Sequence, residues 1–261
     1  MKQIDLNCDM GESFGAYQMG ADDEVMPHIT SANIACGWHA GDPMVMDRTI
    51  RMAIAHNVNT GAHPGYPDLM GFGRRPMNLT PVEIRNYIIY QVGALQGFCN
   101  VHNTRVSHVK PHGSLYLKAV ENEDIAKSIA EGIVSVSSDI AFIALAGEKG
   151  KIMAKVGEEF GLRVIYEAFP DRAYTPDGNL APRGQEGSVK TDPSEIAERA
   201  LMMAEEGKIV DTSGNIIEIE IETLCLHGDT IHAGTLVRTI RKTLEKAGIN
   251  VKPALDPWQN G

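Results

Sequence analysis

The sequence lacks the features that mark secreted and membrane proteins. Its four cysteines (Cys8, Cys36, Cys99 and Cys225) include no CxxC pair, which favours reduced thiols over a disulfide framework. No run approaches 18 apolar residues, so no membrane span is expected. The first expected strand begins almost at Met1, which leaves no room for a signal peptide. The sequence therefore predicts a soluble protein of the cytoplasm.

Signatures of nucleic-acid and nucleotide binding are missing as well. The formal net charge is −10 with no basic stripe, whereas a duplex-binding surface needs clustered lysine and arginine. There is no G-x-x-x-x-G-K-[ST] loop, and no G-x-G-x-x-G motif follows a strand. A nucleic-acid partner is therefore not expected, and any nucleotide must be bound by a less familiar arrangement.

The sequence does contain a regular alternation of strands and helices. Three helices are marked by a capping residue followed by proline, at Asp42, Thr80 and Asp192. Apolar, β-branched segments separate the helices, at residues 3–7, 30–35, 59–62, 108–110, 141–146, 163–167 and 223–226. This alternation predicts parallel strands with right-handed crossovers. Seven such strands predict an α/β fold with one TIM-like (β/α) barrel over residues 1–261 and a small hairpin insertion near 209–222.

Polar side chains follow nearly every expected strand at its C-terminal end. Parallel barrels bring these ends to one face, where their active sites are built. Four of the nine histidines lie beside glycine, or one residue away from it, after four different strands: His39, His63, His112 and His227. The other polar residues at these ends are Asn7, Asp9, Glu12, Asn33, Asp42, Asp68, Arg74, Arg75, Lys110, Glu167, Asp171, Arg172 and Asp229. This pattern favours convergence on one site.

Several of these residues also have a structural interpretation. Asp42 is better explained as the cap of the following helix than as a catalytic acid. Glu12 could equally cap a local turn, and Arg74 and Arg75 could be an ordinary solvated pair. The remaining histidines are assigned structural roles: His28, His56, His102, His108 and His232.

The carboxylates and imidazoles of this set allow two kinds of chemistry. Together they could hold a divalent metal such as Zn²⁺, although no H-E-x-x-H or H-x-x-E-H signature is present. Without a metal, the same groups form general acid–base pairs near neutral pH. Lys110 with Arg172 or Arg183 could bind a carboxylate or a phosphate. Residues 169–188 are rich in glycine and proline, and we expect them to form a lid over the barrel.

Six blocks of the sequence resemble the LamB/YcsF family, in the order in which that family has them. They are IDLNCDMGESFG, SANIACGWHAGDP, GAHPGYPD with GFGRR, VKPHGSLY, EAFPDRAY and CLHGD, and the resemblance runs from residue 4 to about residue 250. It implies an irregular seven-stranded barrel like that of the glycoside hydrolase/deacetylase superfamily. It also implies the A subunit of an ATP-dependent 5-oxoprolinase, which opens 5-oxo-L-proline to L-glutamate together with B and C subunits.

With the resemblance in view, we hypothesise a role for most of the strand-end residues. Asp9 and His112 are expected to be the acid–base pair. Lys110 and Arg172 are expected to bind the substrate carboxylate or a phosphate. Substrate and water would be oriented by Asn7, Glu12, Asn33, Glu167 and Asp229. We expect His39, His63 and His227 either to bind a metal or to complete a hydrogen-bond network. ATP is the expected cosubstrate, with Mg²⁺ accompanying it or a transition metal at the histidines.

Two other functions remain open from the residues. One is a metal-dependent deacetylase or amide hydrolase that acts alone on a small acylated substrate, and it depends on the histidine set and on fold analogy, which is weak. The other is a non-enzymatic subunit that binds a small acid and regulates partners. The many polar residues at the strand ends argue against the second.

Overall fold

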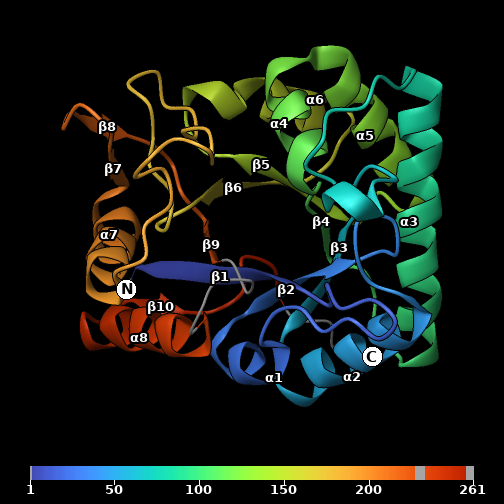
Figure 1. Ribbon diagram of the computed structural model, residues 1–261, viewed down its shortest axis with the longest axis horizontal. Coiled ribbons are helices and arrows are strands. Elements are labelled where there is room, and N and C mark those ends of the chain that lie inside the picture. Colours follow the sequence, from blue (N-terminus) through green and yellow to red (C-terminus); the bar gives the residue numbers. More distant parts are fainter. Residues whose placement is uncertain (1, 227–232, 257–261) are drawn as a thin grey trace.

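The computed structural model describes residues 2–226 and 233–256, and its central feature is a closed barrel of seven parallel strands (Figure 1). In barrel order these are β1 (Gln3–Met10), β2 (Ser31–Ala35), β3 (Asn59–His63), β4 (His108–Val109), β5 (Ala141–Leu145), β6 (Val164–Ala168) and β9 (Thr223–Leu226). The barrel closes because β9 pairs with both β6 and β1. The predicted seven-stranded α/β barrel is therefore confirmed.

Helices surround the barrel on its outside (Figure 1). They are α1 (Asp22–Val25), α2 (Pro43–Ala55), α3 (Pro81–Val101), α4 (Gly113–Glu121), α5 (Glu123–Val136), α6 (Lys151–Glu159), α7 (Pro193–Glu206) and α8 (Ala233–Lys246). Short 3₁₀ turns lie at η1 (Met26–His28), η2 (Leu69–Gly71) and η3 (Glu148–Gly150). The helices bury their apolar faces against the strands, as crossover helices do.

The three predicted caps begin helices where the sequence placed them. The Asp42 carboxylate accepts from the backbone N–H groups of Met44 and Val45, at the start of α2. Thr80 and Glu83 form a reciprocal capping box at the start of α3. Asp192 accepts from two N–H groups at the start of α7. In each case proline occupies the first turn, where its missing N–H costs nothing.

Some elements differ from the sequence prediction. β1 continues three residues past Asn7 to Met10, which places Asp9 within the strand. The α4 helix was not expected, and it ends at Glu121, directly before Asn122, the residue that caps α5. A further short strand, β10 (Asn250–Val251), pairs with β1 outside the barrel. By contrast, a hairpin was predicted near 209–222, and there, between α7 and β9, β7 (Lys208–Val210) and β8 (Ile216–Glu218) pair antiparallel.

The N-terminal end of the barrel is closed by the segment after β10. Ala254 and Leu255 pack against Ala141, Ile143 and Ile165 there. All four cysteines are free and buried. Within residues 2–226 and 233–256, no helix combines the length and the apolar character that crossing a membrane requires.

Candidate active site

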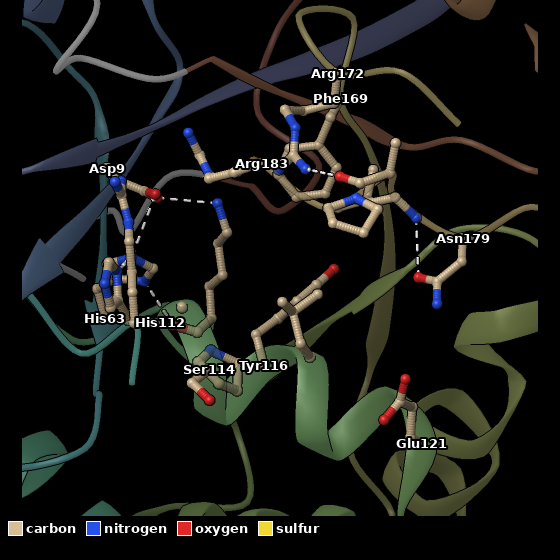
Figure 2. A pocket seen from close by; sticks show the side chains of 18 residues that line it. Asp9, His63, His112, Ser114, Tyr116, Glu121, Phe169, Arg172, Asn179 and Arg183 are labelled. Atoms are coloured by element: carbon tan, nitrogen blue, oxygen red, sulfur yellow. Dashed lines mark hydrogen bonds and ion pairs between the residues drawn. The ribbon is translucent and has the colours of Figure 1, made fainter. Parts of the chain in front are cut away.

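A cavity of about 460 Å³ lies at the C-terminal ends of the barrel strands. One wall comes from the ends of β1 and β3 and carries Asp9 and His63, beside His112 at the start of α4 (Figure 2). The opposite wall is the segment after β6, from Phe169 to Arg183. A cavity of this size is typical of small-molecule sites.

A buried ammonium group links the two walls. Lys110 Nζ lies 2.9 Å from Asp9 Oδ1 and 3.0 Å from Glu167 Oε1, and the Cys225 sulfur is 2.9 Å away. Burial lowers the pKa of Lys110, but the nearby Asp9, Cys225 and Glu167 outweigh it and raise the pKa well above its usual value. Glu167 accepts a second contact from the Tyr116 hydroxyl, at 3.1 Å. Lys110 is therefore charged and already surrounded by acidic groups.

Two asparagines lie close to this ammonium, and one of them, Asn33, holds the Asp9 carboxylate. Asn33 Nδ2 donates to Asp9 Oδ1 at 2.9 Å and to Asn7 Oδ1 at 2.7 Å. Asn33 Oδ1 lies 2.8 Å from His108 Nε2, which makes the imidazole the donor in that contact. The His108 ring fits only because residue 61 is glycine, since an added Cβ there would lie 2.0 Å from Nε2. Asp9 is thus fixed by a connected set of buried polar groups.

His63 and His112 meet edge to edge above Asp9. His63 Nδ1 lies 2.7 Å from the Lys110 carbonyl oxygen, and His112 Nε2 lies 2.8 Å from the Phe72 carbonyl oxygen. A carbonyl can only accept, so both of these nitrogens carry their protons. The remaining nitrogens, His63 Nε2 and His112 Nδ1, are 2.9 Å apart, and Asp9 Oδ2 is 3.3 Å from His63 Nε2. Burial, and secondarily His63, hold the pKa of His112 well below its usual range.

His39 and Glu12 complete this group of side chains. The His39 and His112 rings are parallel, with centroids 3.7 Å apart, and His39 Nε2 lies 3.9 Å from Glu12 Oε1. Neither His39 nitrogen has a hydrogen-bond partner among the described residues. Burial is the main cause that places the pKa of His39 well below its usual range, followed by His112 and His63. Glu12, His39, His63 and His112 each present a ligand atom within 4.8 Å of the others, so they could hold a metal ion.

The structure brings together most of the residues that the sequence singled out, but at different depths. Asp9, His63, Lys110, His112 and Arg172 line the cavity. Asn7, Glu12, Asn33, His39 and Glu167 are buried around them without lining it. Asp68 lies apart from these groups, in an ion pair with Arg75. His227 and Asp229 lie outside the described residues, as does His232.

Arg172 and the 169–188 segment are more ordered than a detached lid. The Arg172 guanidinium donates to the carbonyl oxygens of Ala181 and Ser188, and is itself buried. Tyr174 is fully buried, and its hydroxyl accepts from the Phe169 N–H at 2.8 Å. Arg172 was expected to bind substrate through its guanidinium N–H groups. In the structure these groups instead hold the cavity wall together.

Two further residues line the cavity, of which the sequence did not single out Tyr116 and left Arg74 open between a site residue and a solvated one. Tyr116 lies one helical turn after His112, so α4 presents both on one face, but the helix itself was not predicted. Arg74 lines the cavity and lies over the Phe72 ring, with 4.8 Å between its guanidinium carbon and the ring centroid. Its neighbour Arg75 instead pairs with Asp68. The doublet in the sequence gave no sign of this division.

Comparison with known proteins gives relatives over almost the whole chain. The model described as "LamB/YcsF family" matches residues 4–258. The A subunit of 5-oxoprolinase from Pyrococcus horikoshii is 51% identical over 251 residues, covering 96% of this chain and 97% of the relative. The protein of the same name from Natranaerobius thermophilus is 48% identical over 261 residues and covers both chains completely.

Solved structures agree with the fold. The lactam utilization protein from Thermus thermophilus has a TM-score of 0.89 and 43% identity, and the match covers 96% of this chain and 99% of that one. A polysaccharide deacetylase from Bacillus cereus has a TM-score of 0.50 and 13% identity, covering 97% and 91%. The second likeness concerns the fold alone.

Proposed function

The chain belongs to the LamB/YcsF family, and on that premise we propose that it is the A subunit of a 5-oxoprolinase. In the proposed reaction, 5-oxo-L-proline, water and ATP give L-glutamate, ADP and phosphate. The observation that carries the proposal is the wall formed by Asp9, His63, Lys110 and His112, which faces a cavity of small-molecule size. It offers a carboxylate, imidazoles and a buried cation at one place.

The substrate explains why ATP is needed. The five-membered lactam is an unstrained, resonance-stabilised amide whose closure is entropically easy, so hydrolysis needs activation. Transfer of a phosphoryl group to the amide oxygen makes that oxygen a leaving group. Water then attacks the same carbon, and the ring C–N bond breaks as the ring nitrogen gains a proton, which leaves the phosphate on the new acyl group. A second water hydrolyses this acyl phosphate to the L-glutamate carboxylate and free phosphate. We place the phosphorylation step with the B and C subunits, because this chain lacks a phosphate-binding loop of a familiar kind.

We assign the proton-accepting role to Asp9. Its Oδ1 is held by Lys110 and Asn33, which leaves the Oδ2 side next to His63 and the cavity. A carboxylate fixed in this way can accept a proton from attacking water. His112 has its Nε2 occupied by the Phe72 carbonyl, so it acts together with His63 rather than alone.

Lys110 and the arginines bind different anionic groups. Lys110 already contacts Asp9 and Glu167, so its charge holds the carboxylates of the site in place. Arg74 and Arg183 line the cavity and are exposed, and we assign the substrate carboxylate to them. Ser114 and Tyr116, on the first turns of α4, face the same space (Figure 2).

The direct test is glutamate release from 5-oxoproline, measured with and without ATP, by this chain alone and mixed with its B and C partners. We expect release only when ATP and both partners are present. ATP-independent release from another amide would support the deacetylase-like alternative instead. No turnover in any mixture would contradict an enzymatic role.

A further inference from the structure

Two nitrogen lone pairs face each other in the centre of the site. His63 Nδ1 and His112 Nε2 each donate to a backbone carbonyl, so in neutral rings His63 Nε2 and His112 Nδ1 carry no proton. These two acceptors are nevertheless 2.9 Å apart and buried. Two acceptors at that distance repel each other unless a positive species lies between or beside them. The arrangement therefore requires either a metal ion or one additional proton.

We propose that this species is a divalent metal ion of the Zn²⁺ class, held by His63 Nε2, His112 Nδ1 and the Glu12 carboxylate. Metal-bound histidines usually donate their other ring N–H to a carbonyl or carboxylate, as both rings do here. Two imidazoles and one glutamate form a known catalytic zinc set that leaves a coordination position open.

The distances fit one ion. Nitrogens about 2.0–2.1 Å from a common metal are about 2.9 Å apart when they subtend a right angle at it. That matches the separation of His63 Nε2 and His112 Nδ1. Glu12 Oε1 lies 4.0 Å from His112 Nδ1, against roughly 3.4 Å between two ligands of a tetrahedral ion, so the Glu12 carboxylate would move in by about 0.6 Å on binding. The rings of His63 and His112 are also perpendicular, so both planes can contain the same point.

Ring orientation excludes His39 from the ligand set, although its nitrogens are near enough. An imidazole binds a metal in its own plane. The His39 and His112 planes differ by 2° and are stacked at 3.7 Å, so an ion in the plane of His112 lies well out of the plane of His39. His39 packs against the ligand ring and supports it.

The local charge also favours a cation. Asp9, Glu12 and Glu167 surround the site, and the buried cation among them is Lys110, which already contacts Asp9 and Glu167. A divalent ion next to Glu12 and Asp9 would balance these carboxylates. Asp9 keeps its place beside the ion, 3.3 Å from His63 Nε2, and remains the proton acceptor.

Metal content tests the inference without substrate or partners. Untagged full-length chain is stripped with a chelator, incubated with Zn²⁺ or Co²⁺ and desalted, and bound metal is counted by elemental analysis. We expect one ion per chain, and X-ray absorption of the zinc form should show two imidazoles. Less than about a tenth of an ion per chain, or a metal shell without imidazole, overturns the proposal. An empty site would identify the species as a shared proton.

Variants locate the ion. His63→Gln, His112→Gln and Glu12→Gln should each weaken Co²⁺ binding by more than the 10–100-fold typical of a lost outer partner. His39→Asn removes packing but no ligand and should bind within about tenfold of wild type. The control His102→Gln, whose imidazole pairs with Asp47 away from the cavity, should bind as wild type does. Equal loss in His39→Asn would overturn the ligand set. Where a variant fails to fold, the wild-type absorption spectrum still decides the ligands. Because no assay here uses 5-oxoproline, failure of the metal site and failure of the proposed reaction remain distinguishable.

Discussion

Lys110 and Glu167, from two different strand ends, form an ion pair of 3.0 Å inside the barrel, where the glutamate is fully buried. Lys110→Met would leave Glu167 and Asp9 without that cation. Breaking a buried ion pair on one side costs about 3–5 kcal/mol. We expect a loss of this order in the free energy of unfolding, measured by urea denaturation, and loss of activity.

The exposed pair Lys127–Glu123 supplies the control, because Lys127→Met should leave the free energy of unfolding nearly unchanged. Lys110→Met/Glu167→Gln should recover part of the lost stability, since one carboxylate fewer is left uncompensated. If Lys110→Met proved as stable as wild type, the ion pair would not stabilise the fold.

Asp9→Asn preserves shape and removes the proton acceptor. We expect turnover of the assembled enzyme to fall about 10²–10⁴-fold, as for loss of a general base. Asp192→Asn, at the start of α7, makes the same chemical change away from the cavity and should leave turnover unchanged, because asparagine also caps helices. Near-wild-type turnover in Asp9→Asn would remove Asp9 from the mechanism.

The neighbours Arg74 and Arg75 form a matched pair for substrate binding. Arg74 lines the cavity, whereas Arg75 is paired with Asp68. A hydrogen bond to a charged group contributes about 1.5–3 kcal/mol, so Arg74→Ala should raise KM for 5-oxoproline about 10–100-fold. Arg75→Ala should leave KM unchanged. Steady-state kinetics at saturating ATP measures KM for both variants. Equal KM values would contradict the assignment of the substrate carboxylate to Arg74.

His108 gives a pH dependence whose sign can be worked out. Burial, and then the charges of Lys110 and His63, lower the pKa of His108 to about 3, against about 6.5 in an unfolded chain. Between these values the unfolded chain binds one more proton at this residue. Stability therefore falls as the pH drops below 6.5, by up to about 1.4 kcal/mol per pH unit from this group.

Urea denaturation of wild type and His108→Gln at several pH values between 4.5 and 7.5 isolates that contribution. Other titrating groups are common to both proteins, so the difference between the two curves reports His108. The variant should show a shallower loss of stability on acidification. Parallel curves would mean that His108 is protonated in the folded protein.

The sequence predicted the frame of the fold because its signals are local. Capping residues followed by proline define the starts of α2, α3 and α7. The α4 helix escaped prediction because Pro111 and Gly113 are typical of a break, and Gly113 has a positive φ of 55°. β10 has two residues, too few to show any periodicity.

Polar residues at the strand ends indicate the face of the barrel on which the site lies, but not the depth of each side chain. Asn7 and Asp9 alternate correctly along β1 and point to the same side, yet only Asp9 reaches the cavity. How far each side chain lies along the barrel axis depends on strand stagger, which no single segment encodes. For that reason the sequence predicts that Asn7, Asn33 and Glu167 belong to the site, but it does not show that they are buried behind the cavity lining. His108, assigned a structural role, lies in the same network through its contact with Asn33.

The pairing of β1 with β9 also sets the order in which the molecule can be completed. Asp5 on β1 accepts hydrogen bonds from Thr30 and Ser31, and from Thr223, which is 218 residues away in the chain. During synthesis, β1 can therefore pair with β9 only after nearly the whole chain has been made. Contacts between such distant segments slow folding, because a long loop must close before they form. Until β9 arrives, β1 presents one unpaired edge, and a nascent or truncated chain that ends before Thr223 is expected to associate through it.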